Sequence, residues 1–119
     1  GSVSAEQLSR TFETALSGAL EEDIGSRSDI GRMAFEQKNE GRLDRDWADG
    51  FVTRVFDEMV GILEEHAPEN YFYDVVDYCR EVLGDDEKAG RVFYRFEDEM
   101  RAQVEEEDRD LDWLDELAD

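Results

Sequence analysis

The sequence predicts an all-α protein: a compact, single-domain bundle of four main helices plus short helical pieces, over residues 1–119. Three observations lead to this prediction. Apolar residues recur at spacings of three and four along most of the chain, which is the period of an amphipathic helix. Strand-like alternation of apolar and polar residues is nearly absent outside residues 71–76. One proline and nine glycines leave room for long elements with short connections.

The first predicted helix follows Ser4, which fits an N-terminal capping box with Gln7. In such a box, two side chains satisfy backbone N–H groups that the first helical turn leaves without partners. The helix is expected to end before Gly25. Its apolar stripe is Leu8, Phe12, Ala15, Leu16, Ala19 and Leu20.

Residues 25–45 have the least regular pattern of the chain. We expect only a short helix here, begun by Ser28 or Asp29 and ended by Gly41, because these residue types favour helix termini. Its apolar residues are Ile30, Met33 and Ala34.

The third predicted helix spans roughly residues 46–66, with Asp44 or Asp46 as its N-cap. Pro68 should end it, and can start the next helix, because proline is tolerated in the first helical turn. The stripe that defines this third helix is Phe51, Val52, Val55, Phe56, Met59, Val60 and Leu63.

Two further helices and a tail complete the expected bundle. Gly84 should cap the C-terminus of the fourth helix, and Asp85 or Asp86 should cap the N-terminus of the fifth. Residues 108–119 are expected to form an acidic amphipathic C-terminal segment with one apolar face. The two helical stripes are Phe72, Val75, Val76, Cys79, Val82 and Leu83, and then Ala89, Val92, Phe93, Phe96, Met100 and Val104.

The charge of the chain restricts its partners. With 34 acidic and 13 basic residues, the formal net charge is −21. Direct binding to nucleic acid needs cations that neutralise phosphates, and an anionic membrane surface repels such a chain, so we expect neither. No apolar run approaches the length of a membrane helix. The N-terminus lacks the pattern of a signal peptide, residues 1–2 look like a cloning scar, and we expect a cytoplasmic protein.

The acidic residues concentrate towards the C-terminus. Residues 61–119 carry a net charge of −15, and residues 97–119 alone carry −10. If residues 97–119 formed one straight helix, it would be about 35 Å long. Its charge spacing of about 3.5 Å would then match one strand of DNA. A break near residues 108–110 would remove this geometry.

No residue pattern identifies a catalytic or metal site, and we expect no enzyme, cofactor or metal. His66, the only histidine, is interpreted as a surface residue near a helix C-terminus. Cys79, the only cysteine, lies on an apolar stripe, which favours a buried thiol and excludes an internal disulfide framework. Asp108 begins a register resembling a calcium loop, but Trp113 replaces the required glycine.

Four aromatic residues between positions 71 and 78 stand among acidic residues. They cannot all share one helix face, so some should point outward, where tyrosine beside carboxylates suits a basic partner. The alternative is a wide core-facing helix whose phenol tips reach water. These residues are Tyr71, Phe72, Tyr73 and Tyr78, beside Asp74 and Asp77.

The acidic surface resembles, as a class, DNA-mimic inhibitors such as phage anti-restriction and anti-CRISPR proteins. Helical nuclease-immunity proteins of bacteria are similar in size and charge. The resemblance implies a binding protein whose carboxylates occupy the basic, nucleic-acid-binding site of a partner protein. The residues expected to contact the partner are Glu97, Asp98, Glu99, Glu105, Glu106, Glu107, Asp108, Asp110, Asp112, Asp115, Glu116, Tyr71, Tyr73, Asp74 and Asp77.

A second interpretation explains the same charge as a solvation adaptation. Lys38 and Lys88 are the only lysines, and acid-rich, lysine-poor chains resemble cytosolic proteins of extreme halophiles. The function would then lie in an unidentified helical protein–protein interface, and both interpretations leave a homodimer open. A mimic should concentrate its carboxylates in one elongated band, whereas a halophilic protein should spread them over all exposed faces.

Overall fold

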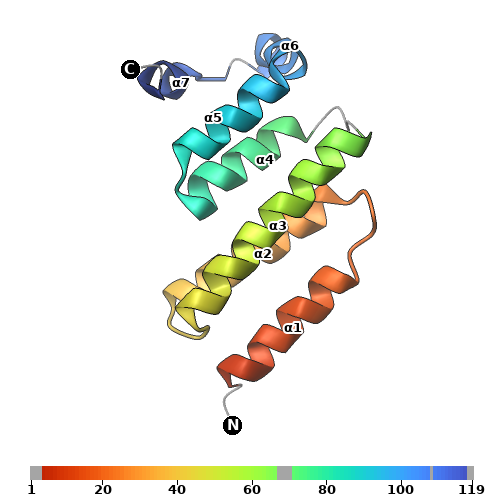
Figure 1. Ribbon diagram of the computed structural model, residues 1–119, viewed down its shortest axis with the longest axis vertical. Helices are drawn as coiled ribbons and strands as arrows, with labels where there is room; N and C mark the ends of the chain where they lie inside the picture. The colour runs from red at the N-terminus through yellow and green to blue at the C-terminus, as the bar shows by residue number, and fades with distance from the viewer. Residues whose placement is uncertain (1–3, 67–70, 108, 118–119) are drawn as a thin grey trace.

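The computed structural model describes residues 4–66, 71–107 and 109–117, with the backbone alone for residues 103–107. Helices account for most of these residues and no strand occurs among them, which confirms the all-α prediction. The molecule measures 50 × 32 × 20 Å (Figure 1). Its elements are α1 (Ala5–Ser17), α2 (Ile24–Asn39), α3 (Arg45–His66), α4 (Phe72–Tyr78), the π-helical turn η1 (Cys79–Leu83), α5 (Asp86–Arg95), α6 (Glu97–Glu107) and α7 (Asp112–Leu117).

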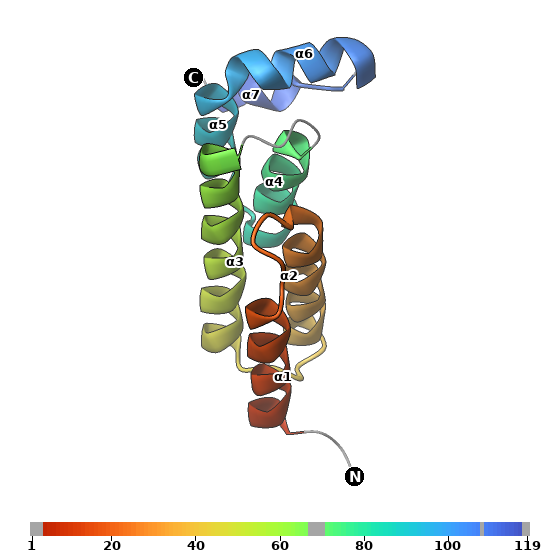
Figure 2. The ribbon, with the colours of Figure 1, turned by 90° about the vertical axis from the view of Figure 1, so that its right-hand side faces the viewer.

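The long helix α3 organises the bundle. It packs along α2 and against α4, while α1 covers the lower half of the pair and α5 lies beside α4 (Figure 1). At the other end, α6 runs across the bundle instead of along it, and α7 lies beneath it (Figure 2). Residues at helical spacing on α3 and α4 form the middle of the core, among them Val55, Phe56, Met59, Val75 and Val76.

Four of the predicted helix caps are confirmed, at Ser4, Asp44, Gly84 and Asp85. Ser4 and Gln7 form both hydrogen bonds of a capping box. Asp44 caps α3 by accepting a 2.9 Å hydrogen bond from the Trp47 N–H, and Asp85 caps α5 in the same way through Lys88. Gly84 ends η1 with φ +63°, a left-handed conformation that glycine adopts without steric cost.

The short helix predicted after Ser28 or Asp29 is wrong in length and start. α2 has 16 residues, and its N-cap is Asp23, which accepts hydrogen bonds from both the backbone and the hydroxyl of Ser26. Periodicity missed its first turns because three of its five buried residues are not apolar. The buried positions are Ile24, Arg27, Ser28, Gly31 and Ala34, whereas Met33 is 56% exposed.

The first predicted stripe also extends too far. α1 ends at Ser17, and the N–H of Gly18 closes its last turn on the carbonyl of Thr14. Leu20 therefore lies in the connection to α2, where its side chain is 75% exposed. Pro68, predicted to separate the third and fourth helices, lies outside the described residues.

The described residues between 97 and 117 do not form one straight helix, so the charge spacing of a DNA strand, which depended on that geometry, does not apply to them. The predicted fifth helix breaks at Phe96, so that α5 and α6 point in different directions, and α6 and α7 are separate helices (Figure 2). Packing explains the first break. Phe96 lies 5.2 Å from Phe72 between ring centroids, and the hydroxyl of Tyr73 donates to the carbonyl of Met100, which holds α6 across α4.

Candidate interaction surface

Helices α6 and α7 lie at one end of the molecule (Figure 2), and both carry exposed carboxylates. Asp98 and Glu99 on α6 are exposed and make no ion pair with any described residue, whereas Glu97 binds Arg101 at 2.8 Å. Asp110 accepts a hydrogen bond from the N–H of Asp112, just ahead of α7. The other predicted carboxylates of α7, Asp115 and Glu116, are also exposed.

Four of the predicted partner-binding side chains lie outside the described part of the chain. Glu105, Glu106 and Glu107 belong to the backbone of α6, but their side chains lie outside the described part, as does the whole of Asp108. The acidic end is therefore defined here by Asp98 and Glu99 on α6 and by Asp112, Asp115 and Glu116 on α7.

The tyrosine cluster of α4 divides between core and surface. Tyr71 is 37% exposed. The placement of Tyr73 among the partner-binding residues is corrected, because its ring is 4% exposed and its hydroxyl is bonded within the fold. Asp77 is partly buried and binds Arg109 at 2.9 Å, so it stabilises the chain end instead of standing free, and Asp74 is also half-buried.

Most arginines are held by the protein's own carboxylates. Within the described part of the chain, nine of the eleven arginines form ion pairs with acidic residues, and six of these nine also lie over an aromatic ring. Arg95 pairs with Glu64 on α3, and Arg109 pairs with Asp77 on α4. The paired arginines are Arg10, Arg27, Arg32, Arg42, Arg54, Arg80, Arg95, Arg101 and Arg109.

A second acidic surface, which the sequence pattern did not indicate, lies at the connection between α1 and α2. A hollow of about 490 Å³ is lined by Leu20, Glu21, Glu22, Asp23, Ile24 and Tyr71, which we call the Tyr71 hollow. Leu20 and Tyr71 are two of the most exposed large apolar residues of the described chain. The run of three acids was visible in the sequence, but periodicity assigned Leu20 to a helix stripe, and nothing placed Tyr71 beside it.

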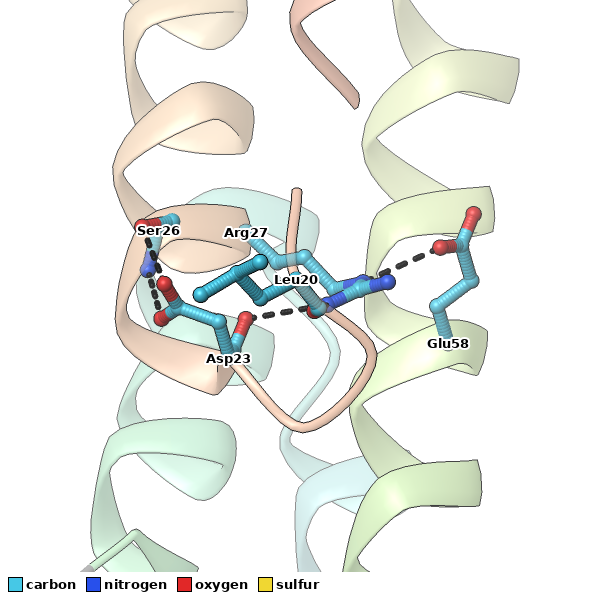
Figure 3. A network of polar contacts seen from close by, with 5 residues as sticks. All are labelled: Leu20, Asp23, Ser26, Arg27 and Glu58. Carbon is cyan, nitrogen blue, oxygen red and sulfur yellow. Dashed lines mark hydrogen bonds and ion pairs between the residues drawn. The ribbon is translucent and has the colours of Figure 1, made fainter. Parts of the chain in front are cut away.

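Arg27 fixes the connection that forms this hollow (Figure 3). Its side chain is buried, and its guanidinium donates to the carbonyls of Leu20 and Asp23, at 2.7 and 3.1 Å, and to Glu58 of α3 at 3.0 Å. The hydrogen bonds from Ser26 lower the pKa of Asp23, which keeps this capping carboxylate charged. The hydrogen bonds of Arg27 therefore fix the backbone of residues 20–23, which lines the hollow.

Cys79 and Tyr78, whose thiol and phenol are nucleophilic when ionised, are both buried in the core. Cys79 is buried, as predicted, and burial raises the pKa of its thiol to about 11, with the nearby charge of Asp85 acting in the same direction. Burial also raises the pKa of Tyr78, whose hydroxyl donates to the carbonyl of Val52. His66 lies at the surface, where its Nδ1 is 2.9 Å from Glu22.

Within the described part of the chain, no three His, Cys, Asp or Glu side chains converge as they would around a metal ion. No helix there has the length and apolar character needed to cross a bilayer. Comparison with known proteins gives no further constraint, because no protein-family model, no curated protein and no solved structure matches this chain.

Proposed function

We propose that this chain is a non-enzymatic acidic binding protein whose carboxylates occupy a basic, nucleic-acid-binding site on a partner protein. The observation that carries the proposal is a contrast within the described chain. Most arginines are paired with carboxylates, whereas Asp98 and Glu99 at the acidic end form no ion pair with a described residue. Because the chain's own acids hold nine arginines, the charge left at the acidic end is almost purely negative. Such a surface attracts a basic partner over long distances and competes with phosphates for its cations.

The test compares two variants that each lose four carboxylates. In the first, Asp98, Glu99, Asp115 and Glu116 at the acidic end become amides. In the control, exposed carboxylates of α2 and α3 that form no ion pair with a described residue become amides: Asp29, Glu36, Asp46 and Asp57. Both variants have the same net charge, so any difference between them reports the position of the carboxylates and not the total charge.

The measurement is fluorescence anisotropy of a labelled DNA duplex bound to a core histone dimer, used as a defined basic protein. Wild-type protein should displace the duplex. The acidic-end variant should need about tenfold more protein, because four surface contacts contribute together roughly 1.4 kcal/mol, whereas the control should stay within about twofold. If both variants displaced the duplex equally weakly, the displacement would depend only on total negative charge, as for any polyanion. That result would contradict the proposal.

The distribution of carboxylates supports a second candidate, an acidic surface adapted to high salt with a function in helical protein–protein interaction. Exposed carboxylates occur on every α-helix of the described chain except α4, including Glu6 of α1, Glu36 of α2 and Glu87 of α5. This is the spread expected of solvation. It does not by itself explain why the excess of acids lies in residues 61–119.

Thermal unfolding in KCl separates the two candidates. For a binding protein we expect cooperative unfolding at about 0.1 M KCl and little gain in melting temperature beyond a few tenths molar, because the Debye length is then only several Å and self-repulsion is screened. Circular dichroism from about 0.05 to 3 M KCl measures this. A melting temperature that continues to rise into the molar range would favour the solvation candidate.

A further inference from the structure

The described chain repeats one local arrangement: a guanidinium lies over an aromatic ring while a carboxylate binds its edge. Arg80 is the clearest case. Its Cζ lies 4.3 Å from the centroid of the Trp113 ring, and its Nε lies 3.1 Å from Asp86. Arg109 does the same with Tyr73 and Asp77, at 4.3 and 2.9 Å. The arrangement uses the planar, delocalised charge of arginine, which can stack and donate hydrogen bonds at once.

Four further arginines repeat the arrangement at longer distances. Their guanidiniums lie 5.2 to 5.9 Å from a ring centroid, and each binds one carboxylate. The sets are Arg32 with Tyr78 and Glu81, Arg54 with Phe51 and Glu13, Arg95 with Phe96 and Glu64, and Arg101 with Phe93 and Glu97.

The Tyr71 hollow contains the same ring and carboxylates without an arginine from this chain. All 13 lysines and arginines of the sequence lie in the described residues, and none of them contacts the Tyr71 ring. Glu21 is exposed and makes no ion pair with a described residue. Glu22 contacts His66, but its side chain remains 67% exposed. Asp23 is different, because Ser26 binds both of its carboxylate oxygens.

We propose that the Tyr71 hollow receives an arginine side chain of the basic partner. The guanidinium stacks on the ring of Tyr71 and pairs with Glu21 and Glu22, while its methylene stem covers the exposed side chain of Leu20. The inference rests on the proposed function, because it names one contact that a basic partner makes. Arginine should bind more tightly than lysine, because a planar guanidinium stacks on a ring while it donates to carboxylates in its own plane. The ammonium of Lys38, which lies 4.9 Å from the Phe35 ring and 2.9 Å from Asp49, shows that lysine can reach both groups, but only as a compact point charge.

The hollow is formed before a partner arrives. Arg27 holds the carbonyls of Leu20 and Asp23, and Asp23 caps α2, so the backbone that carries Glu21 and Glu22 is fixed at both ends (Figure 3). A site held in this way loses less conformational entropy on binding than a free loop does.

The test titrates two capped peptides, an arginine tetramer and a lysine tetramer, into isotope-labelled wild-type protein. The arginine peptide should shift the amide signals of residues 20–25 and of Tyr71, and should bind several-fold more tightly than the lysine peptide. Tyr71→Leu should weaken arginine binding about three- to fivefold and leave lysine binding unchanged. Tyr94→Leu is the matched control, because Tyr94 is an exposed tyrosine of α5 outside the hollow.

The inference is supported if the protein prefers the arginine peptide to the lysine peptide, and if this preference is lost in Tyr71→Leu but kept in Tyr94→Leu. Equal affinity for both peptides, equal loss in both variants, or no shift at residues 20–25 overturns it. The histone competition assay separates this failure from failure of the proposed function. If Tyr71→Leu displaces DNA as well as wild type does, the hollow is not used and the acidic end alone carries the binding.

Discussion

Replacing Gly31 by alanine should lower the melting temperature by about 8 °C. A methyl carbon at this position would lie 2.7 Å from Cε2 of the Tyr78 ring and 2.8 Å from Cζ, inside van der Waals contact. The ring cannot move freely, because Tyr78 is completely buried and its hydroxyl donates a 2.7 Å hydrogen bond to the carbonyl of Val52 on α3. Overpacking of this kind costs roughly 1–3 kcal/mol, or more where a hydrogen bond is also lost.

Two glycines of α3 provide matched controls for Gly31→Ala. Apart from the neighbouring residues and nearby backbone of α3 itself, an added methyl group at Gly50 or Gly61 would meet no described atom within 4 Å. Alanine should therefore stabilise the protein by about 0.5–1 kcal/mol at each position, because it restricts the unfolded chain and favours the helix. Differential scanning calorimetry should show opposite signs at Gly31 and at the two controls. Unchanged or raised stability in Gly31→Ala would mean that α2 and α4 do not approach as closely as described.

Gly31 also shows why α2 was the least predictable helix. Its buried face carries Arg27, Ser28 and Gly31, and each is buried for a reason that hydropathy does not record. Gly31 makes room for a ring, and Arg27 satisfies two backbone carbonyls and one carboxylate. α3 was predictable almost to its ends because its buried face is apolar throughout and Asp44 caps it.

The candidate site was only partly predictable, because its geometry depends on contacts between residues that are far apart in the sequence. Counting charges placed the excess acid in the C-terminal half, and the structure describes exposed carboxylates there on α6 and α7. The direction of α6 depends on Phe96 packing against Phe72 and on the bond from Tyr73 to Met100, contacts between residues 24 to 27 positions apart. The Tyr71 hollow joins residues about 50 positions apart, and no local pattern reports such a meeting.

Replacing Arg27 by methionine should destabilise the protein by about 2 kcal/mol. Methionine keeps most of the apolar stem but removes three hydrogen bonds from a charged donor, and it leaves the carbonyl of Leu20 with only the 3.1 Å bond from the Asp23 N–H. Loss of a fully buried pair would cost 3–5 kcal/mol. The smaller figure applies because the side chain of Glu58 is 37% exposed, so water can replace part of the interaction.

Arg10→Met is the matched control for Arg27→Met. Arg10 also forms an ion pair, with Glu6 one turn away on α1, but both side chains are about three-quarters exposed. Such pairs contribute about 0.3–0.5 kcal/mol, so urea unfolding should place this variant close to wild type. Equal destabilisation of both variants would contradict a specific role for the Arg27 contacts.

The Arg27 substitution also connects stability with binding. Because Arg27 anchors the carbonyls on both sides of Glu21 and Glu22, its loss should free this connection before the bundle unfolds as a whole. Hydrogen exchange should then accelerate at residues 20–26 more than at the α3–α4 core, and the arginine peptide should bind less tightly although Tyr71, Glu21 and Glu22 are all present. Unchanged peptide affinity in a variant with accelerated exchange would show that a preformed hollow is not required for docking.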